Sequence, residues 1–490
     1  MKFSKILERI NLKHNFSAFK DFDVKGLAYD SRKVKPGYIF FAIKGLKDDG
    51  NKYADDAIKY GAKIIFSEED VKTEFPIKVF KVDRIRKFMA TVSGVFYEDP
   101  SAKLKLIGVT GTNGKTTTTY LIRSFLQEAG YKVGLIGTID YQTGNMKMDS
   151  TLTTPESIEM NMMLREMVNS KMDFCVMEVS SIALEMDRVY GLNFDSAIFT
   201  NLTSEHLDFH NDMSNYFEAK KILFDNLKST THAIANKDDE YGEKILKDTL
   251  AKKFFYSMKN DSDLKAFNEK LTLNGLEFYV KYKDNNYKLT SNLTGRFNIY
   301  NILSSVSALL NYNIDMNSIQ KSLLNFHEVS GRFNRIKLPN GAIAVIDYSH
   351  TSDSLKNAVE SAREIVNEEK SKGKVITIFG CGGNKDRTKR RVMGDYATRL
   401  SDHSIITSDN PRFEDPMEII TEILSGVKTK NKFEVIENRE EAIKKGIELS
   451  KEGDIVLICG KGHETYQEVN GVKNHFNDKE MVNKYSSLAK

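Results

Sequence analysis

One stretch of the chain, residues 104–130, joins an apolar run to a glycine-rich turn and then to a segment with helical periodicity. It reads LKLIGVTGTNGKTTTTYLIRSFLQEAG, and Tyr120, Leu121, Phe125 and Leu126 recur at the spacing of one helix face. Backbone N–H groups of a glycine-rich turn at a helix N-terminus form an anion site. We therefore predict a nucleotide phosphate loop between a buried strand and an amphipathic helix, as found in parallel α/β sheets.

This phosphate loop departs from the strict Walker spacing by one residue. Its glycines are Gly108, Gly111 and Gly114, and Val109 stands where that pattern has glycine. Strand, turn, Lys-Thr pair and helix are all present, so we still predict ATP binding, with Lys115 at the phosphates and the Thr116 hydroxyl on Mg²⁺. The alternative is a glycine-rich turn whose threonines only cap the helix.

The rest of the chain alternates apolar strands with helical stretches in three blocks. We predict a small N-terminal α/β domain (1–100), a central ATP-binding domain with a doubly wound, mostly parallel sheet of the P-loop type (101–332) and a C-terminal Rossmann-like domain (333–490). The predicted strands cover 38–43, 62–68, 132–139, 173–179, 195–202, 342–349, 374–383, 403–411 and 454–462. In the last block the strands run into Gly, Asp, Ser or Asn, where ligands bind in open α/β sheets.

Charge and cysteine usage exclude several classes of protein. The 72 basic and 68 acidic side chains leave a net charge of only +4, which favours neither nucleic acid nor an anionic membrane surface as a partner. The cysteines, Cys175, Cys381 and Cys459, show no paired spacing, so we expect a reducing compartment without a disulfide or metal framework. The N-terminus lacks a signal-peptide core and no run of about 18 apolar residues occurs, so we expect a cytoplasmic protein without a membrane span.

Several motifs together resemble those of the Mur ligases, the ATP-dependent amino-acid ligases that build the peptide stem of peptidoglycan. They follow one another over nearly the whole chain, and the set is similar to that of the member that adds the third residue of the stem. The motifs are YDSRKVKPGYIFFAIKGLKDDG (29–50), GTNGKTTT (111–118), MEVSS (177–181), TNLTSEHLDFH (200–210), YFEAKKILF (216–224), GRFNIYN (295–301), VSGRFN (329–334), IDYSHTSDSL (346–355), GCGGNKDRTKRRVMG (380–394), DNPRFEDP (409–416) and GKGHETYQ (460–467).

The resemblance implies that ATP phosphorylates a carboxylate and that an amine then attacks the acyl phosphate. It implies Lys115 as the phosphate-binding lysine, and Thr116, Glu178, His206 and Lys220 as Mg²⁺ ligands. In the family, the lysine at the position of Lys220 is carbamylated by CO₂, which requires an uncharged, buried amine. From the residues alone, Glu178 is equally a capping carboxylate, His206 a loop histidine and Lys220 one of two solvated lysines.

The resemblance also assigns residues to the two nucleotide substrates. On the ATP side it implies Gly111, Thr112, Asn113, Gly114, Lys115, Thr116, Thr117, Asn298, Asn301, Arg332, Asp347 and His350. For UDP-N-acetylmuramoyl-L-alanyl-D-glutamate it implies Tyr29, Ser31, Thr153, Thr154, Ser180 and Arg188. From the residues alone, Arg188 instead pairs with Asp187 or Glu185. The chain departs from the usual family residues at Leu152, Ile182, Met186 and Glu205.

The stretch SDNPRFEDP (408–416) predicts a rigid loop, because proline fixes φ and Asn-Pro favours a turn. Taken alone, its Arg412 pairs with Glu414 or Asp415. In the family, members that add meso-diaminopimelate carry Asp-Asn-Pro-Arg, and those that add L-lysine typically lack this arginine. The resemblance thus implies that Arg412 binds the distal carboxylate of a diamino diacid, Glu464 its distal ammonium and Arg390 the carboxylate near the attacking amine. The complete pocket is Arg390, Asp409, Asn410, Pro411, Arg412, Gly460 and Glu464.

The sequence leaves several alternatives open. Meso-lanthionine has the same two ends as diaminopimelate, so it or L-lysine is an alternative added residue. Other ligases of this fold are rivals: those that add D-glutamate or D-Ala-D-Ala, and folylpolyglutamate synthetase. A P-loop switch or motor ATPase and a non-catalytic homologue are rivals of a different class. We expect the chain to act as a monomer.

Overall fold

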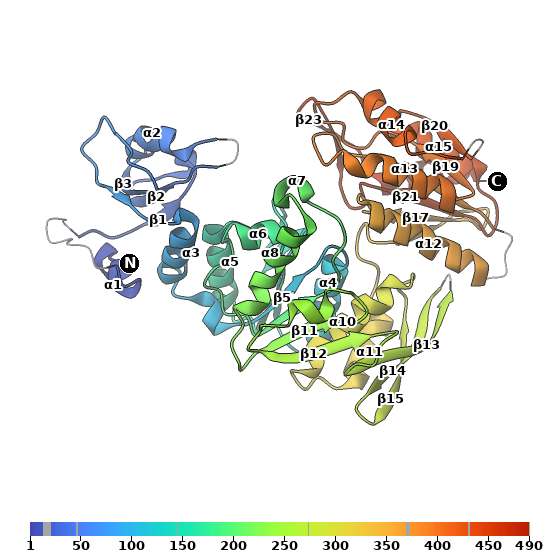
Figure 1. Ribbon diagram of the computed structural model, residues 1–490, viewed down its shortest axis with the longest axis horizontal. Coiled ribbons are helices and arrows are strands. Elements are labelled where there is room, and N and C mark those ends of the chain that lie inside the picture. The colour runs from blue at the N-terminus through green and yellow to red at the C-terminus, as the bar shows by residue number, and fades with distance from the viewer. Residues whose placement is uncertain are drawn as a thin grey trace.

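The computed structural model describes residues 1–12, 21–45, 48–144, 146–272, 274–368, 373–429 and 432–489. These residues form three α/β units that follow one another along the long axis of the molecule, from the N-terminal unit at one end to the C-terminal unit at the other (Figure 1). Each predicted strand contains a strand of the structure, and the strands of each sheet fall within one of the three predicted ranges. The three-domain α/β fold is thereby confirmed, and the exact boundaries at residues 100 and 332 stay a prediction.

The N-terminal unit is a parallel sheet in the order β1-β2-β3-β4. Its core joins the sheet to α3, and Ile158 of the central unit packs into the same core. The elements are α1 (Phe3–Arg9), β1 (Gly26–Ala28), β2 (Tyr38–Ala42), α2 (Ala54–Lys59), β3 (Ala62–Ser67), β4 (Val79–Lys81) and α3 (Ile85–Phe96).

The central unit is built on a sheet in the order β15-β14-β13-β12-β11-β10-β5-β9-β6-β7-β8. Its strands are β5 (Lys105–Thr110), β6 (Val133–Ile136), β7 (Asp140–Thr143), β8 (Met146–Asp149), β9 (Phe174–Glu178), β10 (Ser196–Phe199), β11 (His232–Asn236), β12 (Lys252–Ser257), β13 (Leu264–Thr272), β14 (Gly275–Tyr282) and β15 (Asn285–Ser291). Its helices are α4 (Lys115–Glu128), α5 (Ser157–Asn169), α6 (Ser181–Glu185), α7 (Leu207–His210), α8 (Met213–Asp225), α9 (Gly242–Ile245), α10 (Phe297–Leu310) and α11 (Met316–Asn325).

Helices cover both faces of the central sheet. Strand side chains alternate between the faces, and the apolar ones on each face pack against helices. Ile107 and Val109 of β5 pack with α4, α10 and α11, whereas Leu106 packs with α5, α6 and α8. The strands from β12 to β6 are parallel, and antiparallel hairpins extend both edges. This is the doubly wound arrangement that the sequence predicts. Among the described helices, none has the length and apolar character to cross a bilayer.

The C-terminal unit has the sheet order β16-β17-β21-β18-β19-β20, parallel except for the edge strand β16. Helices α12, α13 and α14 pack on one face, and α15 and α16 on the other. Its strands are β16 (Asn334–Lys337), β17 (Ile343–Asp347), β18 (Val375–Phe379), β19 (His403–Ile406), β20 (Phe433–Val435), β21 (Ile455–Cys459), β22 (Tyr466–Val469) and β23 (Val472–His475). Its helices are α12 (Ser352–Glu368), α13 (Thr388–Leu400), α14 (Pro416–Leu424), α15 (Arg439–Leu449) and α16 (Asp478–Tyr485).

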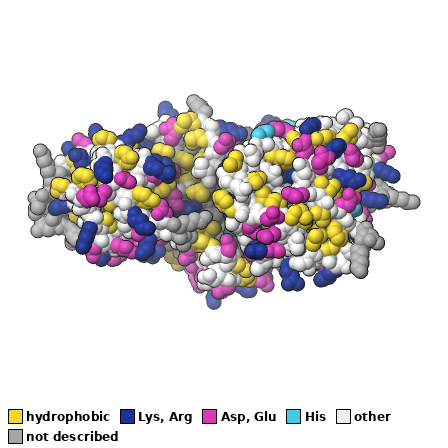
Figure 2. Space-filling view, turned by 90° about the horizontal axis from the view of Figure 1, so that it is seen from above, with side chains coloured by type: hydrophobic (Ala, Val, Ile, Leu, Met, Phe, Trp, Pro, Cys, Tyr) yellow, Lys and Arg dark blue, Asp and Glu magenta, His cyan; other side chains and the backbone are white. Residues whose placement is uncertain are grey.

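The surface carries mixed charge. On the face seen in Figure 2, basic and acidic side chains are interspersed along the whole length of the molecule. This distribution fits the small net charge of +4. A nucleic-acid site would concentrate basic side chains on one face or along one groove.

Candidate active site

The predicted phosphate loop lies between β5 and α4, with Gly111–Gly114 as the turn. Gly111 and Gly114 have φ values of +147° and +87°. A Cβ on Gly111 would lie 1.9 Å from Thr200 Oγ1, and one on Gly114 would lie 2.3 Å from Asn301 Oδ1. Both positions therefore require glycine for conformation and for space.

The loop is braced by the segment that follows β10. Thr112 N donates to Asn201 O at 2.9 Å, and Asn113 N donates to Asn201 Oδ1 at 2.9 Å. Lys115 Nζ donates to the carbonyl oxygens of Gly111 and Thr112 at 2.9 and 2.8 Å. Burial lowers the pKa of Lys115. The loop therefore holds its lysine in place beside the helix N-terminus, where an anion is favoured.

Glu178, the last residue of β9, is buried at the carboxyl edge of the sheet. Its Oε2 accepts hydrogen bonds from Thr116 Oγ1 at 3.1 Å and from Thr138 Oγ1 at 3.0 Å, and its Oε1 accepts from Thr138 N at 2.8 Å. A Cβ on Gly137 would meet Oε1 at 2.6 Å. Carboxylate and hydroxyl oxygens of this kind are the ligands that Mg²⁺ prefers. Thr116 and Glu178 therefore fit the metal that the sequence predicts.

Lys220 of α8 points toward the same loop. Its Nζ donates to Gly111 O at 3.0 Å and lies 4.5 Å from the ring centroid of Tyr216. Burial, followed by the charge of Lys115, lowers the pKa of Lys220 well below its ordinary value. Its neighbour Lys221 instead binds Asp225 and Asp248 at 2.6 and 2.7 Å. The buried, weakly basic amine is therefore Lys220 and not Lys221.

His206 lies in the loop after β10 with φ +57°, and burial lowers its pKa. Its Nε2 is 3.8 Å from Glu205 Oε1. Among the described residues, no group of three or more His, Cys, Asp or Glu side chains could hold a metal. Glu178 and His206 therefore do not belong to such a group in the part of the chain that the structure describes.

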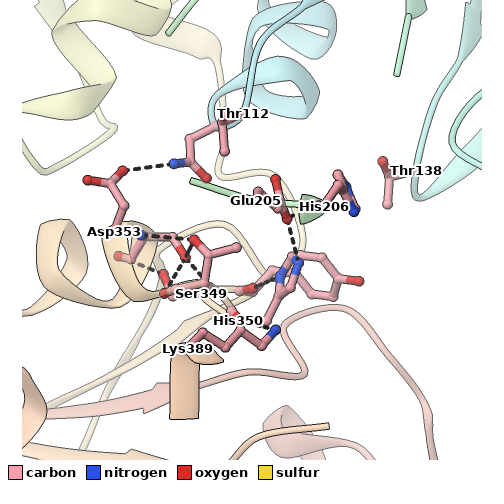
Figure 3. Close-up of polar contacts among 12 residues, drawn as sticks. Thr112, Thr138, Glu205, His206, Ser349, His350, Asp353 and Lys389 are labelled. Atoms are coloured by element: carbon pink, nitrogen blue, oxygen red, sulfur yellow. Dashed lines mark hydrogen bonds and ion pairs between the residues drawn. The ribbon is translucent and has the colours of Figure 1, made fainter. Parts of the chain in front are cut away.

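The C-terminal unit contacts this site directly. Glu205 Oε1 lies 3.2 Å from His350 Nε2, and Asp353 Oδ2 accepts from Asn113 Nδ2 at 3.0 Å (Figure 3). Arg332, in the segment that enters the C-terminal unit, donates from Nη2 to Thr116 Oγ1 at 3.1 Å. Burial raises the pKa of Glu205, but the hydrogen bond with His350 and nearby positive charge outweigh it, and the pKa lies well below its usual range.

Three further residues predicted on the ATP side form internal hydrogen bonds. Asn301 Nδ2 donates to Asn298 Oδ1 at 2.9 Å, and Asn298 Nδ2 donates to Thr294 O at 2.7 Å. Asp347 accepts from Phe333 N at 2.7 Å and from Ser349 N at 2.9 Å. Asn301 thus reaches the phosphate loop at Gly114, whereas Asp347 fixes the turn that carries His350. Thr117 is buried in the first turn of α4.

Next to Glu178 lies the group predicted to hold the dipeptide. Thr154 Oγ1 donates to Glu178 O at 2.9 Å and accepts from Ser180 N at 3.0 Å, and Thr153 contacts Thr138 at 3.1 Å. Arg188 Nη1 donates to Thr154 O at 3.1 Å. These side chains come from the segments after β6, β8 and β9, and they meet at the same edge of the sheet as the phosphate loop.

The local ion pair that the residues alone allow for Arg188 is wrong. Its Nε lies 2.9 Å from Glu156 Oε1, whereas Asp187 binds Arg84 at 3.0 Å. Tyr29 and Ser31 lie in the N-terminal unit. Tyr29 donates to Glu159 Oε1 at 3.2 Å, and Ser31 is buried. No hydrogen bond joins these two residues to the group around Thr154 within the described parts of the chain.

The predicted amino-acid pocket lies where β18, β19 and β21 end. Asn410 Nδ2 donates to Glu464 Oε2 at 2.8 Å, and a Cβ on Gly460 would lie 2.2 Å from Asp409 Oδ2. Arg412 Nη1 donates to Gly383 O at 2.8 Å, and its Nε lies 3.4 Å from Glu468 Oε2. Asp409, Asn410 and Pro411 are buried. The seven predicted residues therefore occupy one corner of the C-terminal sheet.

The local partners considered for Arg412 are wrong. Glu414 binds Arg390, with Oε2 2.8 Å from Nη1, and Asp415 caps α14 by accepting from Met417 N at 2.8 Å. Arg390 is fully buried and also lies 2.9 Å from Glu422. Its guanidinium therefore already has two carboxylate partners in the protein.

Family models match three segments of the chain. They are described as "Mur ligase family, catalytic domain" (residues 23–98), "Mur ligase middle domain" (109–309) and "Mur ligase, glutamate ligase domain" (331–462). A relative from Clostridium acetobutylicum is 45% identical over 94% of this chain and 95% of its own length. The chain belongs to the Mur ligase family. It is accordingly an ATP-dependent ligase, as the sequence predicts.

The relatives and structural neighbours of this Mur ligase extend over nearly its full length. The Clostridium acetobutylicum protein is named UDP-N-acetylmuramoyl-L-alanyl-D-glutamate--2,6-diaminopimelate ligase 1, and a Clostridium botulinum protein with the same name, without the numeral, is 44% identical over 96% of this chain and 97% of its own length. A solved structure titled with that ligase name has a TM-score of 0.66 and 30% identity, and 94% of each chain is covered. MurF from Acinetobacter baumannii, at 16% identity and a TM-score of 0.65 over 96% of this chain and 94% of its own, shares the fold.

Sequence reasoning missed several residues that complete this Mur ligase site. Thr138 binds both oxygens of Glu178, and it lies at the carboxyl end of the predicted strand 132–139, so the rule of strand carboxyl ends could have found it. Three further residues form ion pairs with the predicted ones. Glu156 pairs with Arg188, Glu468 with Arg412 and Lys461 with Glu464. Lys461 stands three residues before Glu464 in a matching motif, whereas nothing in the sequence links Glu468 to Arg412.

Proposed function

We propose that this Mur ligase adds meso-diaminopimelate to the D-glutamate of UDP-N-acetylmuramoyl-L-alanyl-D-glutamate in the synthesis of a peptidoglycan precursor. The observation that carries the proposal is the pocket at the ends of β19 and β21. There a guanidinium, Arg412, and a carboxylate, Glu464, are fixed by the same short loop, since Asn410 binds Glu464 at 2.8 Å. The names of relatives that are 44–45% identical support the same activity.

The distal end of diaminopimelate carries a carboxylate and an ammonium, which complement Arg412 and Glu464. A guanidinium binds a carboxylate through two parallel hydrogen bonds. L-lysine lacks the distal carboxylate and would leave Arg412 without that partner, which costs binding energy. Meso-lanthionine has both end groups and differs only by a central sulfur, so we keep it as the second candidate.

The proposed reaction has two steps. The γ-phosphoryl group of ATP passes to an oxygen of the substrate carboxylate, and ADP leaves. The amine of the incoming amino acid then attacks the acyl carbon, the bond from that carbon to the phosphate oxygen breaks, and phosphate departs. Lys115 and Arg332 would face the transferred phosphate, and their charges would offset the charge that develops there.

We propose that Thr116, Glu178, His206 and a carbamylated Lys220 hold Mg²⁺. The metal would screen the repulsion between the phosphate and the substrate carboxylate. Lys220 supports this proposal because its amine is buried and bonded only to a carbonyl among the described groups. Such an amine is readily uncharged, and as a nucleophile it takes up CO₂ and releases a proton, leaving an anionic oxygen ligand.

The UDP-dipeptide would lie between the N-terminal and central units. Tyr29 and Ser31 would contact the uridine end, and Thr153, Thr154, Ser180 and Arg188 the muramoyl-dipeptide. All proposed groups come from one chain, so we propose that a monomer is sufficient. The proposed substrates are charged and water-soluble, and we propose that the reaction takes place in the cytoplasm.

Phosphate release tests this function. We expect release to require the UDP-dipeptide and the diamino acid together, with a tripeptide product of the corresponding mass. Release with ATP alone, unaffected by either substrate, would instead support a P-loop switch. Absence of release with every amino acid would support a non-catalytic homologue.

A further inference from the structure

The two side chains that would hold the distal end of the amino acid each form an ion pair with an oppositely charged residue of the protein. Lys461 Nζ lies 3.1 Å from Glu464 Oε2, and Glu468 Oε2 lies 3.4 Å from Arg412 Nε. The Lys461 side chain is 0% exposed, and those of Glu464, Arg412 and Glu468 are 16%, 23% and 20% exposed. Lys461 is therefore entirely enclosed by protein, whereas Glu464, Arg412 and Glu468 each keep some exposed surface.

Glu464 is held by one oxygen only. Its Oε2 accepts from Lys461 Nζ at 3.1 Å and from Asn410 Nδ2 at 2.8 Å. No described group bonds to Oε1. Because both donors converge on the same oxygen, they fix the plane of the carboxylate and leave its other oxygen for a ligand.

Arg412, like Glu464, is bonded through only part of its charged group. Its Nη1 donates to Gly383 O at 2.8 Å, its Nε faces Glu468, and no described group bonds to Nη2. The backbone is in the left-handed region at φ +55°, which costs energy for a residue with a Cβ. Hydrogen bonds with β22 and with the turn that follows it offset that cost, because Arg412 N donates to Glu468 O at 3.0 Å and Asn470 N donates to Arg412 O at 2.6 Å.

The side chain of Asn410 connects the acidic arm, which is Glu464 with Lys461, to the basic arm, which is Arg412 with Glu468. Asn410 Oδ1 accepts from Lys461 Nζ at 3.0 Å and from Glu468 N at 2.9 Å, and its Nδ2 binds Glu464. An aspartate at this position would bring a second carboxylate against Glu464 and could not donate. The orientation of the acidic arm and the position of β22, which carries Glu468, are therefore set by the same side chain.

We propose that Lys461 and Glu468 are positioning residues that determine the specificity for an amino acid whose distal end carries both charges. This inference rests on the proposed function. Lys461 orients Glu464 toward the distal ammonium, and Glu468 orients Arg412 toward the distal carboxylate. Arg412 and Glu464 carry opposite charges and therefore match a zwitterionic end better than the singly charged end of L-lysine, and Lys461 and Glu468 each neutralise the charge of the residue that they orient.

The Lys461→Met variant tests the acidic arm, with Lys473→Met as its matched control. Lys473 also lies over the ring of Tyr466, at 4.2 Å against 5.5 Å for Lys461, but it is exposed on β23 and has no contact with Glu464. In K461M we expect KM for meso-diaminopimelate to rise roughly 10- to 100-fold, as for a misplaced binding group. We expect its preference over L-lysine to fall, because the pocket gains net negative charge. K473M should match the wild type.

Glu468→Gln tests the basic arm and covers the case in which K461M does not fold. It keeps the shape of a half-buried side chain on a hairpin, and it should also raise KM for diaminopimelate, because Arg412 is no longer oriented toward the distal carboxylate. KM for ATP and for the UDP-dipeptide should stay unchanged in both variants, which a general loss of structure would not allow. Wild-type KM for diaminopimelate in E468Q, together with wild-type KM and preference in any folded K461M, would overturn the inference. A wild-type enzyme that does not use diaminopimelate would overturn the proposed function itself.

Discussion

Nε2 of His350 lies 3.2 Å from Oε1 of Glu205, although the two residues are 145 positions apart in the sequence. Together with the bond from Arg332 to Thr116, this contact places the C-terminal unit directly on the phosphate loop. The amino-acid pocket and the phosphate site belong to different sheets. They can act on one bond only when the two units are held in such an arrangement.

Replacing Glu205 by alanine should loosen this arrangement. A hydrogen bond that involves a charged group contributes about 1.5 kcal/mol or more, and its loss would shift the balance toward separated units by about tenfold. The radius of gyration in small-angle scattering should rise in E205A and stay unchanged in Asp208→Ala, which removes an exposed acid from the neighbouring helix. An unchanged scattering profile in E205A would show that other contacts set the domain arrangement.

Replacing Lys220 by alanine should lower kcat by roughly 100-fold or more, since the proposed carbamate ligand of the metal is lost. Short-chain carboxylic acids should restore part of the activity, because they can occupy the space and supply the missing oxygen. Lys221→Ala is the control, as its amine binds Asp225 and Asp248 away from the loop. Full activity of K220A, or no rescue by any acid, would contradict a carbamylated Lys220.

Replacing Glu178 by glutamine should raise the Mg²⁺ concentration needed for half-maximal activity by at least about tenfold. The amide can keep the shape of the group, but it offers only one oxygen to the metal and to Thr116 and Thr138. Removal of Mg²⁺ by a chelator should abolish phosphate release in the wild type, and added Mg²⁺ should restore it. The same Mg²⁺ dependence in E178Q and the wild type would exclude Glu178 as a ligand.

The partly buried His463 should make the protein less stable in mild acid. Burial lowers the pKa of His463 from 6.5 to about 3. Between these values the unfolded chain binds a proton that the folded chain does not, so stability is complete above pH 6.5 and falls as the pH decreases. His463→Asn should remove about 1 kcal/mol of this loss at pH 5.5.

Thermal melting of wild type and H463N between pH 5 and 8 measures the effect of His463. The two curves should diverge only below pH 6.5, with a flatter decline for H463N. His475→Asn is the control, because that side chain is 67% exposed on β23. Parallel curves for all three proteins would mean that His463 takes up its proton in the folded state as well.

The strands and the phosphate loop could be predicted from the sequence because their signals are local. A run of apolar residues, a glycine turn and a helical repeat are each contained in a few consecutive residues, as in 104–130. The same holds for Lys115 and Thr116, at the start of the helix after the predicted loop, and for Glu178, at the end of a predicted strand, because these positions lie at one edge of a parallel sheet.

The partners of the arginines could not be predicted in this way. Arg188 binds Glu156 and Arg412 faces Glu468, because the acids next to these arginines in sequence bind other groups. Asp415 caps a helix, and Glu414 compensates the buried Arg390. A buried guanidinium takes the carboxylate that tertiary packing brings to it, and sequence separation says little about that choice.

The central claim is that the pocket around Arg412 selects a diamino diacid, and an amino-acid panel tests it most directly. The measurement is kcat/KM of the wild-type enzyme for meso-diaminopimelate, meso-lanthionine and L-lysine, each with UDP-dipeptide and ATP. We predict that diaminopimelate exceeds L-lysine by at least about 100-fold, because lysine leaves Arg412 without its carboxylate, and that lanthionine lies within about tenfold of diaminopimelate. Equal or better use of L-lysine would contradict the assignment of Arg412.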